Sequence, residues 1–143
     1  MTSPQPRAAT AAEWNERSQG HLPGLIEMVV TEIGKGAAAG RLDVKPHHLA
    51  PNGFLHAATI IGLADTLCGY GCTMSVPEDA SGFTTIELKS NFLGTVRSGA
   101  IAARARMIHG GRMTQVWDAE VVDEASGKPI ATFRCTQMVL YPR

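Results

Sequence analysis

NGFLHAATIIGLADTLCGYGC, the segment at residues 52–72, is apolar and rich in small side chains, yet it holds one carboxylate. Asp65 is the only Asp, Glu, Lys or Arg between Lys45 and Glu78. The apolar run is too long for one strand, so the pattern predicts a helix, and the near absence of charge predicts that this helix is buried. An ionised side chain in such a place is costly unless it has a partner. Asp65 is therefore either a structural acid bonded to an amide or to Thr66, or a functional group.

The segments on both sides of this helix alternate in polarity with the two-residue period of β-strands. In the segment 100–109, for example, Ile101 and Ala103 lie on one face and Arg104 and Arg106 on the other. Each strand is expected to bury one face. We predict strands at residues 25–33 and 37–44, which form a hairpin before the helix, and at residues 84–93, 100–109, 113–122 and 129–140 after it. A helix that is apolar all round must be enclosed, so we predict an α+β domain in which a curved antiparallel sheet, its last four strands in a meander, wraps around the helix.

The N-terminal part of the chain is predicted to be separate from this domain. Residues 1–21 form an arm with one short helix at residues 11–18, because Thr10 and Glu13 match a capping box in which each side chain accepts the other's backbone N–H. Residues 22–143 form a single domain, since the length allows one core. The arm contains no continuous apolar segment typical of a signal peptide or membrane span, so we expect a cytoplasmic protein.

Charge and cysteine content argue against several classes of partner. The 13 Lys and Arg residues balance the 13 Asp and Glu residues, and no Lys/Arg run occurs. A binder of nucleic acid or of an anionic membrane needs a basic patch, so neither partner is expected. Cys68, Cys72 and Cys135 lack the spacing of a zinc site and are predicted to be reduced packing thiols. We expect no metal and no cofactor.

Helical geometry predicts a hollow beside Asp65 and separates this residue from His56. Two of the same-face neighbours of Asp65, Gly62 and Gly69, have no side chain. His56 lies nine residues earlier, which places it about 180° around the helix and ~13 Å along it. The two side chains cannot converge within one chain. If both act at one site, a second copy must supply one of them, which requires a homo-oligomer.

The start of the segment carries a motif. Gly53-Phe-Leu-His56-Ala57-Ala58, followed by Leu63-Ala64-Asp65, resembles the G-x-x-H-G-G…L-A-D/E signature of hotdog-fold acyl-CoA thioesterases, the group that contains phenylacetic-acid-pathway and 4-hydroxybenzoyl-CoA thioesterases. The resemblance covers roughly residues 22–141. It implies the hotdog fold, a curved antiparallel sheet wrapped around a long central helix. It also implies hydrolysis of an acyl- or aryl-CoA thioester to CoA and a carboxylic acid, with CoA as part of the substrate.

The resemblance implies roles for four residues. Asp65 matches the catalytic carboxylate, which either attacks the thioester carbonyl or activates the hydrolytic water. Ala57 matches the residue whose backbone N–H at the helix start polarises the carbonyl oxygen. His56 matches the histidine that orients this loop, and Thr85 matches a Ser or Thr that positions the water or the acid. In the family the carboxylate of one subunit faces the histidine loop of its dimer mate, which implies a homodimer or a dimer of dimers.

The chain departs from the family pattern at three places. Ala57 and Ala58 stand where the motif has two glycines, Ala50 stands where an Asn or Gln is common, and Gly69 stands where some relatives have Thr or Ser. Asn52 is the candidate substitute for the polar side chain missing at position 50. The other predicted substrate-binding residues are Gly53 and Ala58 at the helix start, Gly69 beside the acid, Phe83 with Phe54, Ile60, Ile61 and Tyr70 as apolar pocket walls, and Arg104, Arg106 and Arg112 for the phosphates of CoA.

Two other functions stay open. Hotdog domains also support hydratases and dehydratases that act on acyl thioesters, and release of a free thiol separates these from a thioesterase. The altered histidine loop is also compatible with a non-catalytic acyl-CoA-binding module, which would bind acyl-CoA without turnover.

Overall fold

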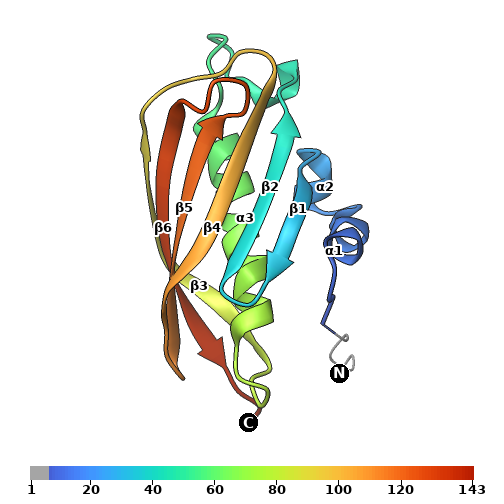
Figure 1. Cartoon of the computed structure of the whole chain (residues 1–143), viewed down its shortest axis with the longest axis vertical. Helices are drawn as coiled ribbons and strands as arrows, with labels where there is room; N and C mark the ends of the chain where they lie inside the picture. The colour runs from blue at the N-terminus through green and yellow to red at the C-terminus, as the bar shows by residue number, and fades with distance from the viewer. Residues whose placement is uncertain (1–6) are drawn as a thin grey trace.

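The apolar segment forms the central helix, which begins at Ala57 because His56 has an extended backbone and caps it. The structure is a computed structural model that describes residues 7–143 (Figure 1). No helix in this range is both long and apolar enough to cross a membrane. The elements, in chain order, are α1 (Ala11–Ser18), α2 (Leu22–Leu25), β1 (Val29–Gly34), β2 (Ala37–Asp43), the 3-10 turn η1 (Pro46–His48), α3 (Ala57–Ser75), β3 (Gly82–Phe92), β4 (Ala100–Gly110), β5 (Thr114–Asp123) and β6 (Pro129–Leu140).

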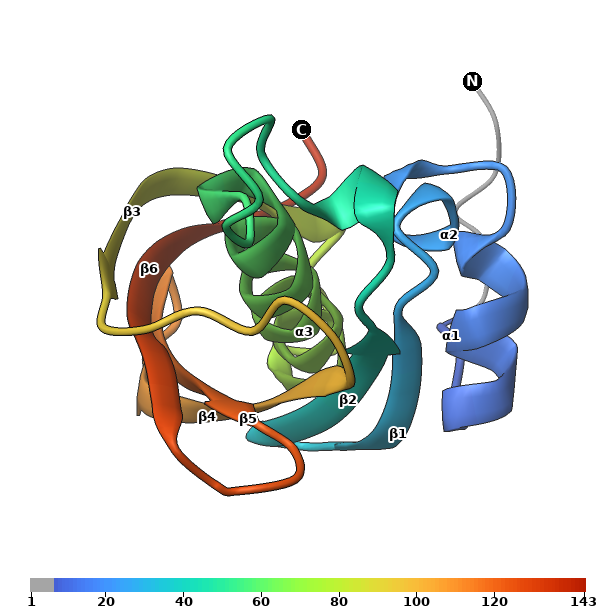
Figure 2. The same cartoon turned by 90° about the horizontal axis from the view of Figure 1, so that it is seen from above.

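The strands form one antiparallel sheet of six strands in the order β1-β2-β4-β5-β6-β3. The predicted meander of the last four strands is confirmed for β4, β5 and β6, which pair in that order. It is wrong for β3, which pairs with β6 at one edge of the sheet, while β4 pairs with β2. Residues 93–99 carry the chain across from β3 to β4 (Figure 2). Alternating polarity specifies which face of a strand is buried but not which strand lies beside it, so the pattern could not give this order.

The sheet curves around α3, as predicted, and the helix packs mainly against β2 and β4 (Figure 2). Leu63 and Leu67 of α3 are fully buried, and so is Trp117 of β5. Gly71 permits the contact with Trp117, since a Cβ atom at this position would lie 2.5 Å from Cη2 of the indole ring. The lack of a side chain on this face of α3 therefore lets the helix and the sheet approach closely.

The three cysteines are free and buried, as predicted for packing thiols. Burial raises the pKa of the Cys72 thiol to about 12. A thiol that stays protonated in this way is a poor nucleophile, which fits a packing role.

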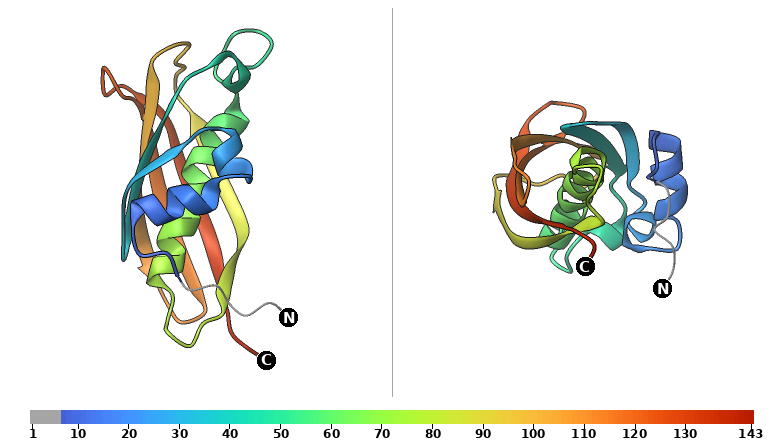
Figure 3. Two further views of the ribbon diagram at one scale, coloured as in Figure 1. Left: turned by 90° about the vertical axis from the view of Figure 1, so that its right-hand side faces the viewer. Right: turned by 90° about the horizontal axis from the view of Figure 1, so that it is seen from below.

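The N-terminal helices lie beside β1, and in the left view of Figure 3 α1 passes in front of α3. α1 has the predicted bounds, and Thr10 Oγ1 accepts the N–H of Glu13 at 3.2 Å. The predicted capping box is incomplete, because the Glu13 carboxylate accepts the N–H of Ala9 and not that of Thr10. Trp14 of α1 stacks on Tyr70 of α3, with ring centroids 4.2 Å apart.

The first strand begins later than predicted. The segment Leu22–Leu25 forms the single helical turn α2, with Pro23 at its start, and Glu27 then takes the left-handed conformation with φ 57°. These residues delay the start of β1 to Val29. The boundary predicted between arm and domain at residue 21 stays a prediction, and residues 1–6 of the arm lie outside the described residues.

β3 is an edge strand with two exposed faces. Its pattern predicts one buried face, but Ile86 is 52% exposed, Leu88 40% and Phe92 46%. Leu88 and Phe92 pair with the buried Cys135 and Ala131 of β6, so they point to the inner side of the sheet. Part of this inner surface therefore stays uncovered by the described residues.

Candidate active site

A cavity of about 250 Å³ lies beside the middle of α3. Gly69 widens it, since a Cβ atom at this position would lie 3.1 Å from Cζ of Phe83. Four predicted site residues, Asp65, Gly69, Phe83 and Thr85, meet here. The full lining comes from α1, α2, α3 and β3 and consists of Trp14, Pro23, Asp65, Thr66, Gly69, Tyr70, Thr73, Phe83 and Thr85.

The Asp65 side chain is half-buried, and its Oδ1 atom is fully buried without a hydrogen-bond partner among the described residues. Burial raises the pKa of this carboxyl group above its ordinary value. The structural alternative, a carboxylate whose oxygens bond to an amide or to Thr66, is therefore not what is observed. A desolvated acid without a partner inside a cavity is typical of a functional group.

Thr85 lies where β3 contains a β-bulge, as the register of β3 on β6 shifts between Thr85 and Glu87. Its Oγ1 donates a hydrogen bond to Oε1 of Gln137, 2.6 Å away, and Gln137 is fully buried. Bulges near functional sites re-aim side chains in this way. Sequence reasoning missed Gln137, although its place between Cys135 and Val139 in an inward-facing row marks it as a buried polar residue.

The first turn of α3 presents a backbone N–H without a partner. His56 is the N-cap: its Nδ1 accepts the N–H of Ala58 at 2.9 Å, and its carbonyl oxygen accepts the N–H of Thr59 at 3.0 Å. In the range 7–143 the N–H of Ala57 has no hydrogen bond, and the residue is exposed. A free N–H at the positive end of a helix suits a carbonyl oxygen that gains negative charge.

The two alanines of this turn fit their backbone conformation. Ala57 and Ala58 belong to α3, and Glu27 is the only described residue other than glycine with a positive φ. The left-handed conformation falls on Gly53, with φ 86°, in the turn before the helix. Replacing the two motif glycines by alanine therefore causes no backbone strain.

His56 and Asp65 do not meet within one chain. His56 caps the exposed start of α3, whereas Asp65 lines the cavity beside its middle. Asn52 is held in the preceding turn, where its Oδ1 accepts a backbone N–H at 3.2 Å. The predicted catalytic residues thus form two half-sites, Ala57 with His56 and Asp65 with Thr85, at separate places on the chain.

Residues 52–130, more than half of the chain, match the profile of the thioesterase superfamily. The chain belongs to this superfamily. The matching range of this thioesterase runs from the turn before α3 into β6, so it includes both half-sites.

Individual relatives of the thioesterase agree with this assignment. The chain is 32% identical over 115 residues to 1,4-dihydroxy-2-naphthoyl-CoA hydrolase of Listeria monocytogenes, which covers 80% of this chain and 92% of that protein. A variant of a thioesterase from Pseudomonas aeruginosa superposes with a TM-score of 0.88 at 26% identity and covers 98% of this chain and 100% of its own. A thioesterase from Haemophilus influenzae, 24% identical, has the same fold with a TM-score of 0.86 and covers 94% of this chain and 92% of its own. The predicted hotdog fold and thioester hydrolase class are confirmed.

The apolar walls of the thioesterase cavity were predicted in part. Tyr70 and Phe83 line the cavity, whereas Trp14 and Pro23 complete it without having been predicted. Both come from α1 and α2, and no local pattern links them to α3. The other predicted wall residues do not line it: Phe54, Ile60 and Ile61.

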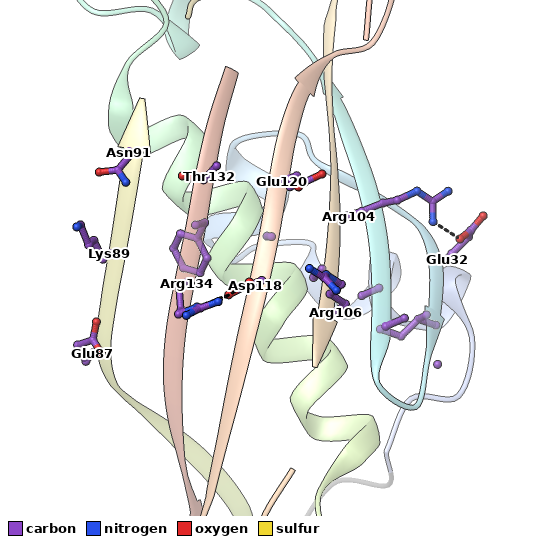
Figure 4. A pocket seen from close by; sticks show the side chains of 17 residues that line it. Glu32, Glu87, Lys89, Asn91, Arg104, Arg106, Asp118, Glu120, Thr132 and Arg134 are labelled. Carbon is purple, nitrogen blue, oxygen red and sulfur yellow. Dashed lines mark hydrogen bonds and ion pairs between the residues drawn. The ribbon is translucent and has the colours of Figure 1, made fainter. Parts of the chain in front are cut away.

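Two predicted phosphate ligands lie on the outer face of the sheet, away from this cavity. Arg104 and Arg106 project from β4 into a cleft of about 770 Å³, where Arg104 pairs with Glu32 at 3.3 Å (Figure 4). Arg112 pairs with Asp79 at 2.7 Å. None of the three arginines lines the cavity beside α3, so CoA binding stays a prediction for each of them.

Another cation of the thioesterase adjoins the start of α3. Arg97, in the β3–β4 connection, has its Cζ 4.7 Å from the centroid of the Phe54 ring. Its guanidinium forms no ion pair with any described residue. Thr95 Oγ1 accepts the N–H of Leu55 at 3.0 Å and ties the same connection to the helix start. Sequence reasoning missed Arg97, because an isolated arginine in a loop carries no signal of its own.

A cluster of one glutamate and two histidines has the residue types of a metal site, but one of the histidines has no ring nitrogen free to bind a metal. Glu27, His47 and His48 bring ligand atoms within 4.8 Å of one another. His48 uses both ring nitrogens, since Nδ1 accepts the N–H of Lys45 at 2.9 Å and Nε2 lies 2.7 Å from the carbonyl oxygen of Ile26. The contact with Ile26 fastens the β2–α3 connection to the segment between α2 and β1 instead.

Proposed function

We propose that this protein is an acyl-CoA thioesterase in which Asp65 acts on the thioester, as nucleophile or as general base. The observation that carries the proposal is the buried Oδ1 atom of Asp65, which has no partner and belongs to a side chain that lines a cavity. A purely structural carboxylate would be hydrogen-bonded there. Membership of the thioesterase superfamily and the likeness to a CoA hydrolase support a CoA thioester as the substrate.

Both roles of Asp65 lead to the same products. As a general base, the carboxylate takes a proton from a water molecule whose oxygen attacks the thioester carbon; the C–S bond then breaks, and the CoA sulfur receives the proton. As a nucleophile, the carboxylate attacks the carbon itself, CoA leaves, and water hydrolyses the resulting anhydride. A pKa raised by burial makes Asp65 more reactive in either role.

A second copy of the chain completes the site in this proposal. The half-site of Ala57 and the half-site of Asp65 lie apart on one chain, yet one reaction centre needs a carbonyl polariser and a carboxylate together. The free edge of β3 and the uncovered Leu88 and Phe92 on its inner face offer a surface for a partner copy. Phe54, beside His56 and 46% exposed, adds to the apolar surface near the helix start. A homodimer, alone or paired into a dimer of dimers, meets this requirement.

The test measures free thiol released from aryl-, phenylacetyl- and straight-chain acyl-CoAs by Asp65→Asn and Asp65→Ala variants. Removal of a catalytic acid–base group is expected to lower kcat at least ~10²-fold. Glu120→Gln is the matched control, because it removes one exposed carboxylate from the outer face of β5 and should keep the wild-type kcat.

Unchanged turnover by a folded Asp65→Asn variant would contradict the proposal. Consumption of an enoyl-CoA without thiol release would identify a hydratase instead. Saturable binding of acyl-CoA with no turnover across the panel would identify a binding module.

A further inference from the structure

Gln137 is a fully buried glutamine behind the cavity, and the proposed reaction does not use it. It lies on the inner side of β6 between Cys135 and Val139, which are buried as well. A buried side-chain amide costs stability unless its polar atoms are hydrogen-bonded. Its Oε1 accepts the Thr85 hydroxyl at 2.6 Å, whereas its Nε2 lies 3.5 Å from Sγ of Cys135, a weak acceptor. The bond to Thr85 is therefore the stronger of these two contacts.

This bond fixes the direction of the Thr85 hydroxyl. A threonine hydroxyl has one proton to donate and two lone pairs that accept. Because the proton points to Oε1 of Gln137, Oγ1 of Thr85 can only accept a hydrogen bond from a group inside the cavity. Thr85 is exposed in the single chain, so such a group can reach it. Gln137 is not among the residues that line the cavity, and it acts on the site only through Thr85.

The Asp65 carboxylate adds a second acceptor to the same cavity. Its Oδ1 atom is fully buried without a partner among residues 7–143, which leaves Oδ2 as the oxygen that the cavity reaches. The Thr85 hydroxyl lines this cavity too, but it has no proton left for the carboxylate. An ionised carboxylate only accepts. Asp65 and Thr85 are thus two acceptors that cannot bond to each other directly.

A water molecule can satisfy both acceptors at once. It has two O–H groups, so it can donate one to Asp65 and the other to Oγ1 of Thr85, while a lone pair on its oxygen stays free to attack. The cavity of about 250 Å³ exceeds the ~30 Å³ of one water molecule, so a thioester carbonyl group fits beside it. A water held in this way has the geometry that a general base requires.

We propose that Gln137 is a positioning residue, which holds the Thr85 proton away from Asp65 so that Thr85 and Asp65 together orient the hydrolytic water. The inference rests on the proposed thioesterase activity and selects its general-base route. Asp65 takes one proton from the water, the water oxygen bonds to the thioester carbon, the C–S bond breaks, and Asp65 passes the proton to the CoA sulfur. Without Gln137, the Thr85 hydroxyl would donate to the Asp65 carboxylate, and the water would lose an acceptor.

The test is a double-variant cycle of Gln137 and Thr85, followed by thiol release from the acyl-CoA that the wild type hydrolyses fastest. Gln137→Met should lower kcat ~10-fold, the scale of one hydrogen bond, with little change in KM, because Gln137 does not line the cavity. Thr85→Val should lower kcat by a similar factor, whereas Thr85→Ser keeps the hydroxyl and most of the kcat. In Thr85→Val protein, adding Gln137→Met should cause no further loss, because no hydroxyl is left to position.

Gln115→Met is the matched control. Gln115 pairs with Gln137 across β5 and β6 and is buried as well, but its Oε1 accepts the N–H of Trp117 and it does not line the cavity. Its replacement removes a buried amide and should keep the wild-type kcat. If Gln137→Met alone does not fold, Thr85→Val is compared with the Gln137→Met/Thr85→Val double variant, in which both bonded groups are replaced by apolar ones.

Three results would overturn the inference: a wild-type kcat in Gln137→Met, a further ~10-fold loss when Gln137→Met is added to Thr85→Val, or an equal loss in Gln115→Met. The last two would show that the buried amide only supports the packing of the sheet. Each of them leaves the proposed function intact as long as Asp65→Asn is inactive. A wild type that releases no thiol from any acyl-CoA would instead overturn the proposed function, and the inference with it.

Discussion

Asp65 combines an electrostatic cost with a chemical use. Its carboxyl group is partly desolvated, so the charged form is disfavoured in the folded chain and its pKa is raised. The folded chain therefore binds this proton more tightly than the unfolded chain. The stability that the proton supplies is present at low pH and is lost as the pH rises through the raised pKa. Functional sites often carry such a cost.

Asp65→Asn is expected to raise the melting temperature at pH 7, because the amide removes a charge that burial disfavours. The gain should shrink as the pH falls through the raised pKa of Asp65, since the wild type then becomes protonated as well. Thermal unfolding of both proteins between about pH 4 and pH 8 measures the difference. Glu120→Gln, at an exposed position, serves as the control. A difference that stays constant with pH would show that ionisation of Asp65 does not set it.

Arg97→Gln is expected to raise KM for acyl-CoA several-fold with little change in kcat, because a guanidinium without an acidic partner beside the start of α3 suits a phosphate of CoA. The effect should weaken at high salt. Arg104→Gln and Arg112→Gln provide the comparison, as both guanidinium groups are already paired with carboxylates. A larger rise in KM for either of these variants would instead indicate that Arg104 or Arg112 binds the phosphates of CoA, as predicted from the sequence.

At the scale of single elements, α3 contributes one residue to each proposed half-site, Ala57 at its start and Asp65 beside its middle. Its position in the sheet depends on close packing. Trp117 is fully buried under Gly71, and Leu67 sits against Gly40 of β2, where a Cβ atom would lie 3.0 Å from Cδ2 of the leucine. Gly71 of α3 and Gly40 of β2 thus set how closely the helix packs against the sheet.

Gly71→Ala is expected to destabilise the fold by ~1–3 kcal/mol, because the new methyl group would overlap the buried ring of Trp117. Gly62→Ala is the matched control on the same helix. Its methyl group would lie 3.2 Å from Cδ1 of Ile26, the end of a flexible side chain, and alanine gains ~1 kcal/mol of helix propensity over glycine. Urea unfolding should show a lower midpoint for Gly71→Ala and an unchanged or higher midpoint for Gly62→Ala. Equal losses of stability in the two variants would indicate that the contact of Gly71 with Trp117 does not set the stability of the Gly71→Ala variant.

At the scale of the whole molecule, the arrangement of the sheet leaves the proposed reaction centre incomplete. β3 ends the sheet with an open edge, and its inner face shows apolar side chains to solvent. A second chain would cover this surface and bring its own start of α3 to the Asp65 half-site. Assembly and catalysis would then depend on the same contacts.

Two inactive variants are expected to restore activity to each other. Ala57→Pro removes only the N–H, because proline is tolerated at the first helical position and His56 already has the extended backbone, with ψ 134°, that precedes a proline. When Ala57→Pro and Asp65→Asn chains are refolded together in equal amounts, half of the dimers contain one chain of each kind. Each of these mixed dimers has one intact site out of two, so about one quarter of wild-type thiol release should return. Asp65→Asn mixed with the Ala57→Pro/Asp65→Asn double variant should restore none. No recovery despite mixed dimers in mass spectrometry would rule out a shared site.

Much of the fold and part of the site follow from short-range patterns. The bounds of α1 follow from Thr10 and Gly20, and those of β6 from its alternation and the preceding turn. Asp65 stands out as the lone charge in an apolar helix. The order of the strands was not predictable, because alternating polarity shows which face of a strand is buried and not which strand it pairs with. The exposure of Leu88 was not predictable either. A strand has the same alternating pattern whether its apolar face is buried by its own chain or by a second chain.

The amino-acid sequence by itself determined the central helix, its lone carboxylate and the separation of His56 from Asp65, because these depend on residues within a few helical turns. Only the tertiary structure decided that Trp14 reaches the wall beside Asp65, and that Arg97 adjoins the start of α3. Such contacts join segments far apart in the chain, and they depend on how the sheet closes around the helix. The hydrophobic periodicity of a single segment does not predict how the sheet closes around the helix.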